Sequence, residues 1–428
     1  MPLMPSLRLP SALRGITSIV SGSIAGQGLV ILSYPFLTRL YDPAELGLLA
    51  VFTSVVGMVG VIAAGCFEPA IPIPPDDGDA ADVAWAALAV VVGTTTVTAV
   101  VGLLAGDALA ALLGVPKLAQ YWWLVAATVF VLGTYMVLSE WMIRDRTYGA
   151  LGRRNFLQGV GQAATQLGLG LAGVRPLGLL LGVGVGRALA MGGLVSRGGL
   201  LRQRRPTLAG LRAAVRRFRR FPLLAAPSAL INSAGLEMPL LLVSALYGDA
   251  RAGLLGLTVR VFSGPTAIIG QAVSQVYTGE TSAAIRSPSG DLGRLLRSAV
   301  RRLLLLGAGP ALLLVVAGPW MFGLIFGPTW TEAGEYARFL AVAYLAQFAV
   351  TPVSSTLFLL ERQGQELVWG CARLLLTAGG VAACGLLGAP VQTAILVLAV
   401  GHLLSYALLY RLCLHAVDAA DARRLPSA

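Results

Sequence analysis

Long apolar runs alternate with short polar segments along the whole chain. Twelve of these runs approach the length of about 20 residues that an α-helix needs to cross about 30 Å of hydrocarbon. They span residues 14–38, 46–72, 84–105, 120–143, 155–174, 176–196, 221–247, 252–278, 302–327, 335–360, 367–387 and 389–414. Because lipid offers the backbone no hydrogen-bond partner, such segments cross a membrane as helices. The pattern predicts an all-α integral membrane protein with about twelve transmembrane helices and no sizeable soluble domain.

The composition agrees with this prediction. Of the 428 residues, 56% are hydrophobic and only 12% are charged, whereas soluble proteins carry about 25% charged residues. The apolar run behind Arg8 and Arg14 is too long for a signal-peptide core, so we interpret it as a retained first span. The four cysteines lie in or at the ends of apolar runs without metal-binding spacing. No metal site and no cofactor is therefore predicted.

The net charge of +12 is distributed unevenly. If the N-terminus is cytoplasmic, 24 of the 32 basic residues fall in loops on that side or at the span ends beside them, 5 at the opposite side and 3 deeper within spans. This bias follows the positive-inside rule and predicts a multi-pass membrane protein with both termini in the cytoplasm. The acidic segment 75–83 has no basic residue, but acidic residues count little in that rule. Such a distribution indicates membrane topology and not a nucleic-acid partner.

The chain repeats part of itself. Residues 37–50, LTRLYDPAELGLLA, match 243–256, VSALYGDARAGLLG, at an offset of 206. This offset pairs the first two predicted helices with the seventh and eighth. Six helices separate the copies, so they enter the membrane in the same direction, as in a parallel repeat with a pseudo-twofold axis along the membrane normal. We therefore predict a six-helix lobe over 1–196, a basic linker over 197–220 and a second lobe over 221–428. The linker either binds anionic head groups or only enforces topology.

One predicted span combines a charge with a polar face. Arg260 lies about 12 Å deep in the eighth predicted helix, and Gln271 and Gln275 project on the same side at 100° per residue. An intramembrane arginine is costly to insert, so this face is expected to line protein or water. Pro265 is expected to bend the helix.

Other polar side chains lie within or at the ends of the predicted spans. The candidate substrate contacts are Arg260, Gln271, Gln275, Gln27, Tyr34, Asn232 and Arg187, and the candidates for coupling or gating are Glu68 and Glu237. For each of them the alternative is a hydrogen bond that joins helices. Arg373 is expected near the cytoplasmic end of its span, where its side chain can reach the surface.

Three segments carry a resemblance to a known family. They are FLTRLYDPAELGLLAVFTSVVG (36–57), GLLGLTVRVFSGPTAIIGQAVSQVY (253–277) and IFGPTWTEAGEYARFLAVAYLAQFAVTPVSSTLFLLERQ (325–363). Together they resemble the polysaccharide transporter family, the O-antigen and capsule flippases of the multidrug/oligosaccharidyl-lipid/polysaccharide exporter (MOP) superfamily. In that family a basic residue often precedes the aromatic–Glu pair that corresponds to Phe67 and Glu68. Here Cys66 occupies that region, which leaves the role of Glu68 open.

The resemblance implies a function and partners. It implies alternating access that moves an oligosaccharide on undecaprenyl diphosphate across the membrane for lipopolysaccharide or capsule biosynthesis. The implied partners are this lipid-linked oligosaccharide, membrane lipids, a polysaccharide polymerase and assembly proteins. The polar side chains above suit such a cargo, because the fork of an arginine binds phosphate oxygens in pairs and amides bind sugar hydroxyls.

A cation-coupled exporter and an enzyme are the alternatives to a flippase. A cation-coupled drug or small-molecule exporter of the same superfamily needs a carboxylate cluster, and the intramembrane glutamates Glu68, Glu140 and Glu237 are predicted on three helices without a common site. An enzyme is disfavoured by the short loops opposite the cytoplasm. A phosphate-binding GxxxxGK[ST] loop is impossible, because the single lysine, Lys117, precedes Leu118. The sequence therefore favours a transporter over an enzyme.

Overall fold

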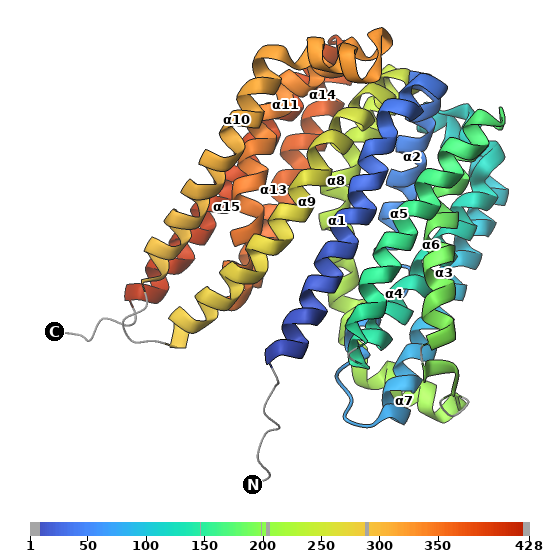
Figure 1. Cartoon of the computed structure of the whole chain (residues 1–428), viewed down its shortest axis with the longest axis vertical. Coiled ribbons are helices and arrows are strands. Elements are labelled where there is room, and N and C mark those ends of the chain that lie inside the picture. Colours follow the sequence, from blue (N-terminus) through green and yellow to red (C-terminus); the bar gives the residue numbers. More distant parts are fainter. Residues whose placement is uncertain (1–8, 146, 198, 203–205, 287–290, 423–428) are drawn as a thin grey trace. The chain divides into compact units, whose positions relative to one another are not determined.

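The computed structural model describes residues 9–145, 147–197, 199–202, 206–286 and 291–422, and these contain helices and turns but no strand (Figure 1). The helices are α1 (Leu9–Leu40), α2 (Pro43–Gly60), α3 (Asp77–Leu112), α4 (Trp122–Arg144), α5 (Tyr148–Leu171), α6 (Leu177–Arg197), α7 (Leu208–Phe218), α8 (Ala226–Tyr247), α9 (Asp249–Arg286), α10 (Leu292–Phe326), α11 (Thr331–Val350), α12 (Ser355–Leu359), α13 (Gln363–Leu374), α14 (Gly380–Leu386) and α15 (Val391–Ala422). The all-α prediction is confirmed.

Each of the twelve predicted apolar runs overlaps one of these helices or a consecutive pair. In the described residues, 8 helical segments are long and apolar enough to cross a membrane, and α9 makes a ninth when its two bent halves are taken together. The remaining predicted spans lie in α1, α5 and α6, which are helical but fail the same test of length and apolarity. The chain is thus a multi-pass membrane protein.

One predicted span is too long. The run 46–72 was expected to be a single helix, but α2 ends at Gly60. The following backbone turns at Gly65 and Cys66, whose φ angles are 63° and 55°. These values lie in the left-handed region, which interrupts a right-handed helix. Glu68 therefore lies in a short 3₁₀ turn beyond the helix and not on its last turn.

The described chain forms two compact units. Unit 1 contains the residues up to Tyr41, Val55–Ala110 and Pro116–Leu230, and unit 2 contains Asp42–Ser54, Ala111–Val115 and the residues from Ile231 onward. The first part of α2 thus belongs to unit 2. The predicted division into lobes at 197–220 stays a prediction.

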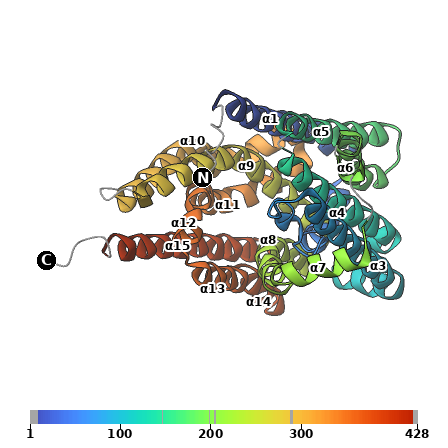
Figure 2. The same cartoon turned by 90° about the horizontal axis from the view of Figure 1, so that it is seen from below.

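In unit 1, α1 packs along α5, and α5 packs along α6 (Figures 1 and 2). Glycines allow this approach. A Cβ atom on Gly22 would lie 2.0 Å from the carbonyl oxygen of Gly152, and one on Gly26 would lie 2.3 Å from that of Asn155. Small residues four positions apart permit close packing of membrane helices, where lipid provides little hydrophobic driving force.

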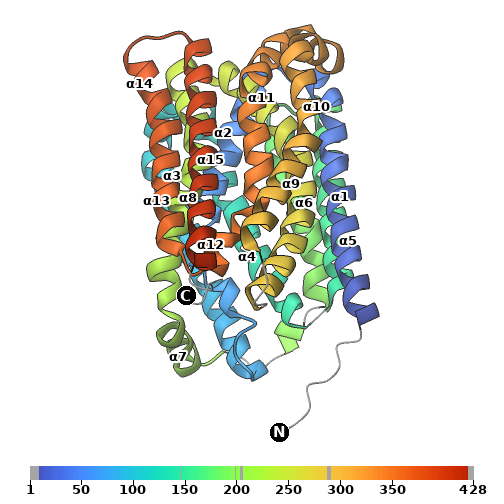
Figure 3. The same cartoon turned by 90° about the vertical axis from the view of Figure 1, so that its left-hand side faces the viewer.

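In unit 2, α10 packs along α11, and α11 packs against both α9 and α15 (Figure 3). The Thr258 hydroxyl on α9 donates to the Ala333 carbonyl on α11 at 2.9 Å. At the same end of these helices, Arg251 forms an ion pair with Glu332. A buried apolar cluster that includes Tyr277, Leu296 and Phe348 joins these helices.

The two copies of the repeated segment meet in unit 2. A Cβ atom on Gly47 would lie 1.9 Å from the carbonyl oxygen of Asp249, and one on Gly253 would lie 1.9 Å from that of Pro43. At the offset of 206, Pro43 is equivalent to Asp249 and Gly47 to Gly253. The two contacts are therefore the same contact made in both directions: the glycine of each copy meets the position in the other copy that corresponds to Pro43 or Asp249. Such reciprocity is the signature of a twofold contact, so this crossing of α2 and α9 supports the repeat found in the sequence.

The acidic segment at the start of α3 has basic neighbours in unit 1. The Arg144 guanidinium on α4 donates to Asp77 at 2.8 Å and to the Pro74 carbonyl at 2.6 Å. On α7, Arg217 lies 3.9 Å from Asp79. These contacts explain why an acidic segment is found among loops that are otherwise basic.

Helix α7, within the basic linker, is positioned by a capping bond and by close packing. The Thr207 hydroxyl accepts a hydrogen bond from the Gly210 amide at 3.1 Å, which is a typical N-cap. A Cβ atom on Gly210 would lie 2.3 Å from the buried Asp82 carboxylate, so α7 closely approaches the start of α3. The linker helix and the acidic segment therefore lie at the same end of unit 1.

This arrangement gives a test of topology. Cysteines introduced as Asp79→Cys and Arg212→Cys are expected to resist a membrane-impermeant thiol reagent in intact cells, whereas Lys117→Cys reacts. All three side chains are exposed, so accessibility depends on the side of the membrane. The exposed Cys371 and the three buried cysteines are first replaced by serine. Permeabilised cells should label all three positions, and labelling of Asp79→Cys from outside intact cells would contradict the predicted orientation.

Candidate substrate and coupling site

Two predicted site residues come together in unit 2. The Glu237 carboxylate on α8 lies near enough to the Ser54 hydroxyl on α2 and to the Arg260 guanidinium on α9 to interact electrostatically with both. Glu237 is partly buried, whereas the Arg260 side chain is exposed on the protein surface. Ser54 is the residue that the repeat makes equivalent to Arg260. The repeat thus brings its own equivalent positions to a shared carboxylate.

Helix α9 bends beyond Arg260. The segments Asp249–Gly264 and Ile269–Arg286 differ in direction by 43°. Pro265 lies between them and lacks the amide that would complete the helical hydrogen bonding, so the expected bend is present. Gln271 and Gln275 follow the bend, and both side chains are exposed. Their roles as substrate contacts stay predictions.

Arg373 is buried, contrary to the expectation that it would reach the surface. Its side chain on α13 is 2% exposed. Its Nη2 donates at 2.7 Å to both the main-chain and the side-chain oxygen of Asn232 on α8, and its guanidinium lies 4.5 Å from the centre of the Trp369 ring. Asn232, predicted to contact substrate, is therefore already occupied with an interhelical bond. The sequence missed this pairing because the two residues are 141 positions apart.

A ladder of rings connects the surroundings of Arg260 to Arg373 in unit 2. Successive ring centroids lie 4.4, 5.3, 5.1 and 5.7 Å apart along Phe262, Tyr344, His402, Tyr406 and Trp369. The buried His402 shares a hydrogen bond of 2.9 Å with Gln347. These contacts join α9, α11, α13 and α15.

Unit 1 contains a comparable cluster that the sequence missed. Arg154 on α5 donates to the Ser139 hydroxyl on α4 and, at 2.8 Å, to the Asn155 side chain. Its guanidinium lies 4.6 Å from the centre of the Tyr135 ring. Asn155 in turn donates to Ser23 on α1 at 2.7 Å.

The sequence pattern predicts Arg154 in a loop, because the fifth apolar run starts only at residue 155. In fact α5 begins at Tyr148. The spacing of four residues between Arg154 and Gln158 places both on one helical face, and this was the signal in the sequence that could have indicated a polar helix here.

Two predicted residues of unit 1 lie near this cluster. Arg187 on α6 donates to the Val183 carbonyl at 3.1 Å and interacts electrostatically with Tyr135. Glu68 is buried, and the structure shows no hydrogen-bond partner among the described residues for its Oε2 atom. Glu140 is near enough to both Glu68 and Arg154 for an electrostatic interaction. The 3₁₀ turn that contains Glu68 packs against α4, which contains Glu140. The prediction that these glutamates share no functional site stays a prediction.

The two predicted residues on α1 differ in exposure. Gln27 is exposed, whereas Tyr34 is 5% exposed and packed inside unit 1. Neither side chain forms a described contact with the clusters above, so their roles as substrate contacts stay predictions.

Comparison with known protein families shows to which family the chain belongs. A profile of the family described as polysaccharide biosynthesis protein matches residues 36–335. The chain belongs to this family. A search of curated protein sequences gave no match.

The fold of this polysaccharide biosynthesis protein has solved counterparts. A multidrug resistance MATE family transporter of the MOP superfamily, in an inward-facing conformation, matches with a TM-score of 0.72 and 16% identity, over 96% of this chain and 100% of that one. The lipid II flippase MurJ, in an inward closed conformation, matches with a TM-score of 0.73 and 9% identity, over 97% and 91%. A MOP superfamily transporter from Pyrococcus furiosus matches with a TM-score of 0.59 and 14% identity, over 95% and 96%. These structures share the fold of this chain, so the fold expected from the resemblance to MOP transporters is confirmed.

Proposed function

We propose that this protein is a flippase that moves an oligosaccharide linked to undecaprenyl diphosphate across the bacterial inner membrane by alternating access. The transported oligosaccharide serves surface polysaccharide biosynthesis, as O-antigen or capsule. The protein acts as a transporter and not as an enzyme. Membership of the polysaccharide biosynthesis protein family, together with the fold shared with MurJ and MATE transporters, supports this class of function.

The observation that carries the proposal is the exposed Arg260 beside Glu237. An exposed arginine in a membrane-length helix is stable only where water or a ligand reaches it. Its planar fork binds phosphate oxygens with two parallel charge-assisted hydrogen bonds. The diphosphate of the cargo is the group that this side chain fits, and the nearby Glu237 carboxylate attracts the guanidinium electrostatically.

The remaining parts of the cargo have matching features. Exposed amides at Gln271 and Gln275 lie beyond the bend of α9 and offer donors and acceptors to sugar hydroxyls. The polyprenyl chain stays in the lipid. Because transporters with internal repeats move one repeat against the other around a fixed site, the reciprocal contact of Gly47 and Gly253 is a natural pivot for that motion.

A second function is favoured by one specific observation. Glu68 and Glu140 interact in unit 1, and Glu237 is partly buried in unit 2. Carboxylates inside the membrane are the groups that a cation-coupled exporter requires. A drug or small-molecule exporter of the same superfamily is therefore the alternative.

Deletion of the gene separates these functions. We expect lipid-linked oligosaccharide to accumulate on the cytoplasmic leaflet and surface polysaccharide to be lost, because synthesis continues while export stops. The measurement is the leaflet distribution of the extracted oligosaccharide by periodate oxidation of intact and lysed spheroplasts, with a plasmid copy of the gene as the control. If the linked oligosaccharide is never made, the protein is not a flippase. Changed drug resistance with normal polysaccharide would select the exporter.

A further inference from the structure

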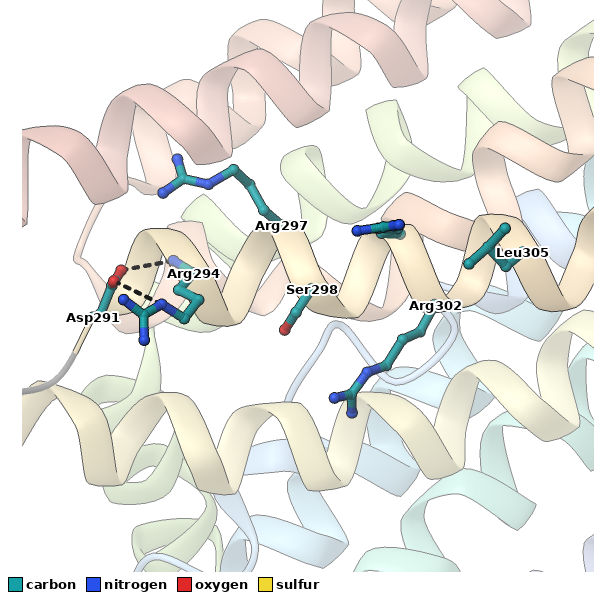
Figure 4. Close-up of a pocket in the computed structure, with 7 residues that line it drawn as sticks. Asp291, Arg294, Arg297, Ser298, Arg302 and Leu305 are labelled. Carbon is teal, nitrogen blue, oxygen red and sulfur yellow. Dashed lines mark hydrogen bonds and ion pairs between the residues drawn. The ribbon is translucent and has the colours of Figure 1, made fainter.

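Helix α10 carries a basic hollow at its first turns. The hollow has a volume of about 680 Å³ and is lined by Asp291, Arg294, Arg297, Ser298, Arg301, Arg302 and Leu305. Figure 4 shows Arg297 and Arg302 projecting to opposite sides of the helix, with Ser298 between them. Four arginines therefore surround a surface depression on a single helix of unit 2.

Only one of these arginines is neutralised. Asp291 accepts a hydrogen bond from the Arg294 amide at 2.7 Å and forms an ion pair of 3.3 Å with its guanidinium. Within the described part of the chain, the structure shows no carboxylate in ion-pair distance of Arg297, Arg301 or Arg302. All three side chains are exposed. The hollow thus presents three positive charges to its surroundings.

An exposed apolar stripe continues from the hollow along the same face of α10. Leu305, Leu312 and Val316 are 68%, 65% and 68% exposed. At 100° per residue they project within about 60° of Arg301. Side chains of this kind are stable when they face acyl chains, so this face of α10 is directed toward lipid.

The length of the stripe places the arginines at the level of the head groups. Trp320, 68% exposed, lies about one turn beyond the last residue of the stripe, Val316. It follows Arg301 by 19 residues, which corresponds to about 28 Å of helix, close to the roughly 30 Å thickness of the hydrocarbon. Tryptophan is enriched at membrane–water interfaces. Trp320 and Arg301 therefore mark the two interfaces.

We propose that this hollow binds the head group of an anionic phospholipid, whose acyl chains lie along Leu305, Leu312 and Val316. The three uncompensated guanidinium groups select a negatively charged head group, and their planar forks match the oxygens of a phosphodiester. The continuous apolar stripe selects a lipid over a soluble phosphate. This site is separate from Arg260 and does not depend on the proposed transport function.

The experiment measures retention of phosphatidylglycerol by the purified full-length protein in detergent, using native mass spectrometry over a series of lipid concentrations. We expect Arg297→Gln/Arg301→Gln/Arg302→Gln to bind phosphatidylglycerol at least about tenfold more weakly, because each basic residue near the membrane surface contributes about fivefold. Retention of phosphatidylcholine should not change. If the triple variant does not fold, Arg301→Gln alone should show the loss of about fivefold.

The matched control is Arg39→Gln/Lys117→Gln/Arg175→Gln, which removes the same charge from exposed positions in unit 1 outside the basic linker. We expect this control to retain phosphatidylglycerol as the wild type does. An equal loss in both variants would assign the effect to general attraction and overturn the proposal, as would an unchanged α10 variant. Displacement of phosphatidylglycerol from the wild type by equimolar undecaprenyl diphosphate would also overturn it, because the hollow would then belong to the cargo.

Discussion

Replacing Gly253 by alanine is expected to remove most of the protein from the membrane, whereas Gly279→Ala on the same helix leaves its level unchanged. A Cβ atom on Gly253 would lie 1.9 Å from the Pro43 carbonyl oxygen, while one on Gly279 meets nothing within 4 Å. A backbone atom cannot move aside as a flexible side chain can. The two helices must therefore separate, at a cost above the roughly 1–3 kcal/mol of ordinary overpacking.

Membrane abundance and the melting temperature of the detergent-purified protein measure this effect. Gly47→Ala should behave like Gly253→Ala, since the contact is reciprocal. The double variant should lose less stability than the sum of the single losses, because one separation of the helices accommodates both methyl groups. Wild-type abundance and melting temperature for Gly253→Ala would show that α2 and α9 do not cross at these glycines.

Replacing Arg260 by alanine should reduce transport per molecule to below about a tenth while leaving abundance near normal. A hydrogen bond between the guanidinium and the diphosphate of the cargo would contribute about 1.5–3 kcal/mol to binding. Abundance should stay near normal because removal of the exposed side chain leaves no cavity. Arg260→Lys should recover part of the activity, because lysine keeps the charge but loses the planar fork. Transport of the lipid-linked oligosaccharide into proteoliposomes, normalised to protein, is the measurement.

Arg373→Ala is the matched control in the same unit. Its side chain is buried and donates to two oxygens of Asn232 across the helix pair, so its removal leaves a cavity and breaks an interhelical contact. We therefore expect lower abundance with little change in transport per molecule. Normal transport in Arg260→Ala would exclude Arg260 from the site. Low abundance with normal activity per molecule would instead assign Arg260 to packing.

The sequence by itself determined most of the helices and which two segments are equivalent copies. Apolar runs of membrane length identify helices because hydrogen bonding in lipid allows few alternatives. The repeat predicted which segments are equivalent, and the reciprocal contact of Gly47 and Gly253 agrees with it. Pro265 marked the bend of α9 because proline removes a specific helical hydrogen bond.

Only the tertiary structure decided how the polar groups are partnered. Asn232 and Glu237 are five residues apart, yet one bonds Arg373 and the other interacts with Arg260. Arg154 looked like a loop residue and is in fact hydrogen-bonded between α4 and α5. The periodicity of a helix gives the direction of a side chain within that helix, but not which helix lies opposite. Partners more than a hundred residues away are chosen by the packing of whole helices, and this packing alone distinguishes the exposed Arg260 from the buried Arg373.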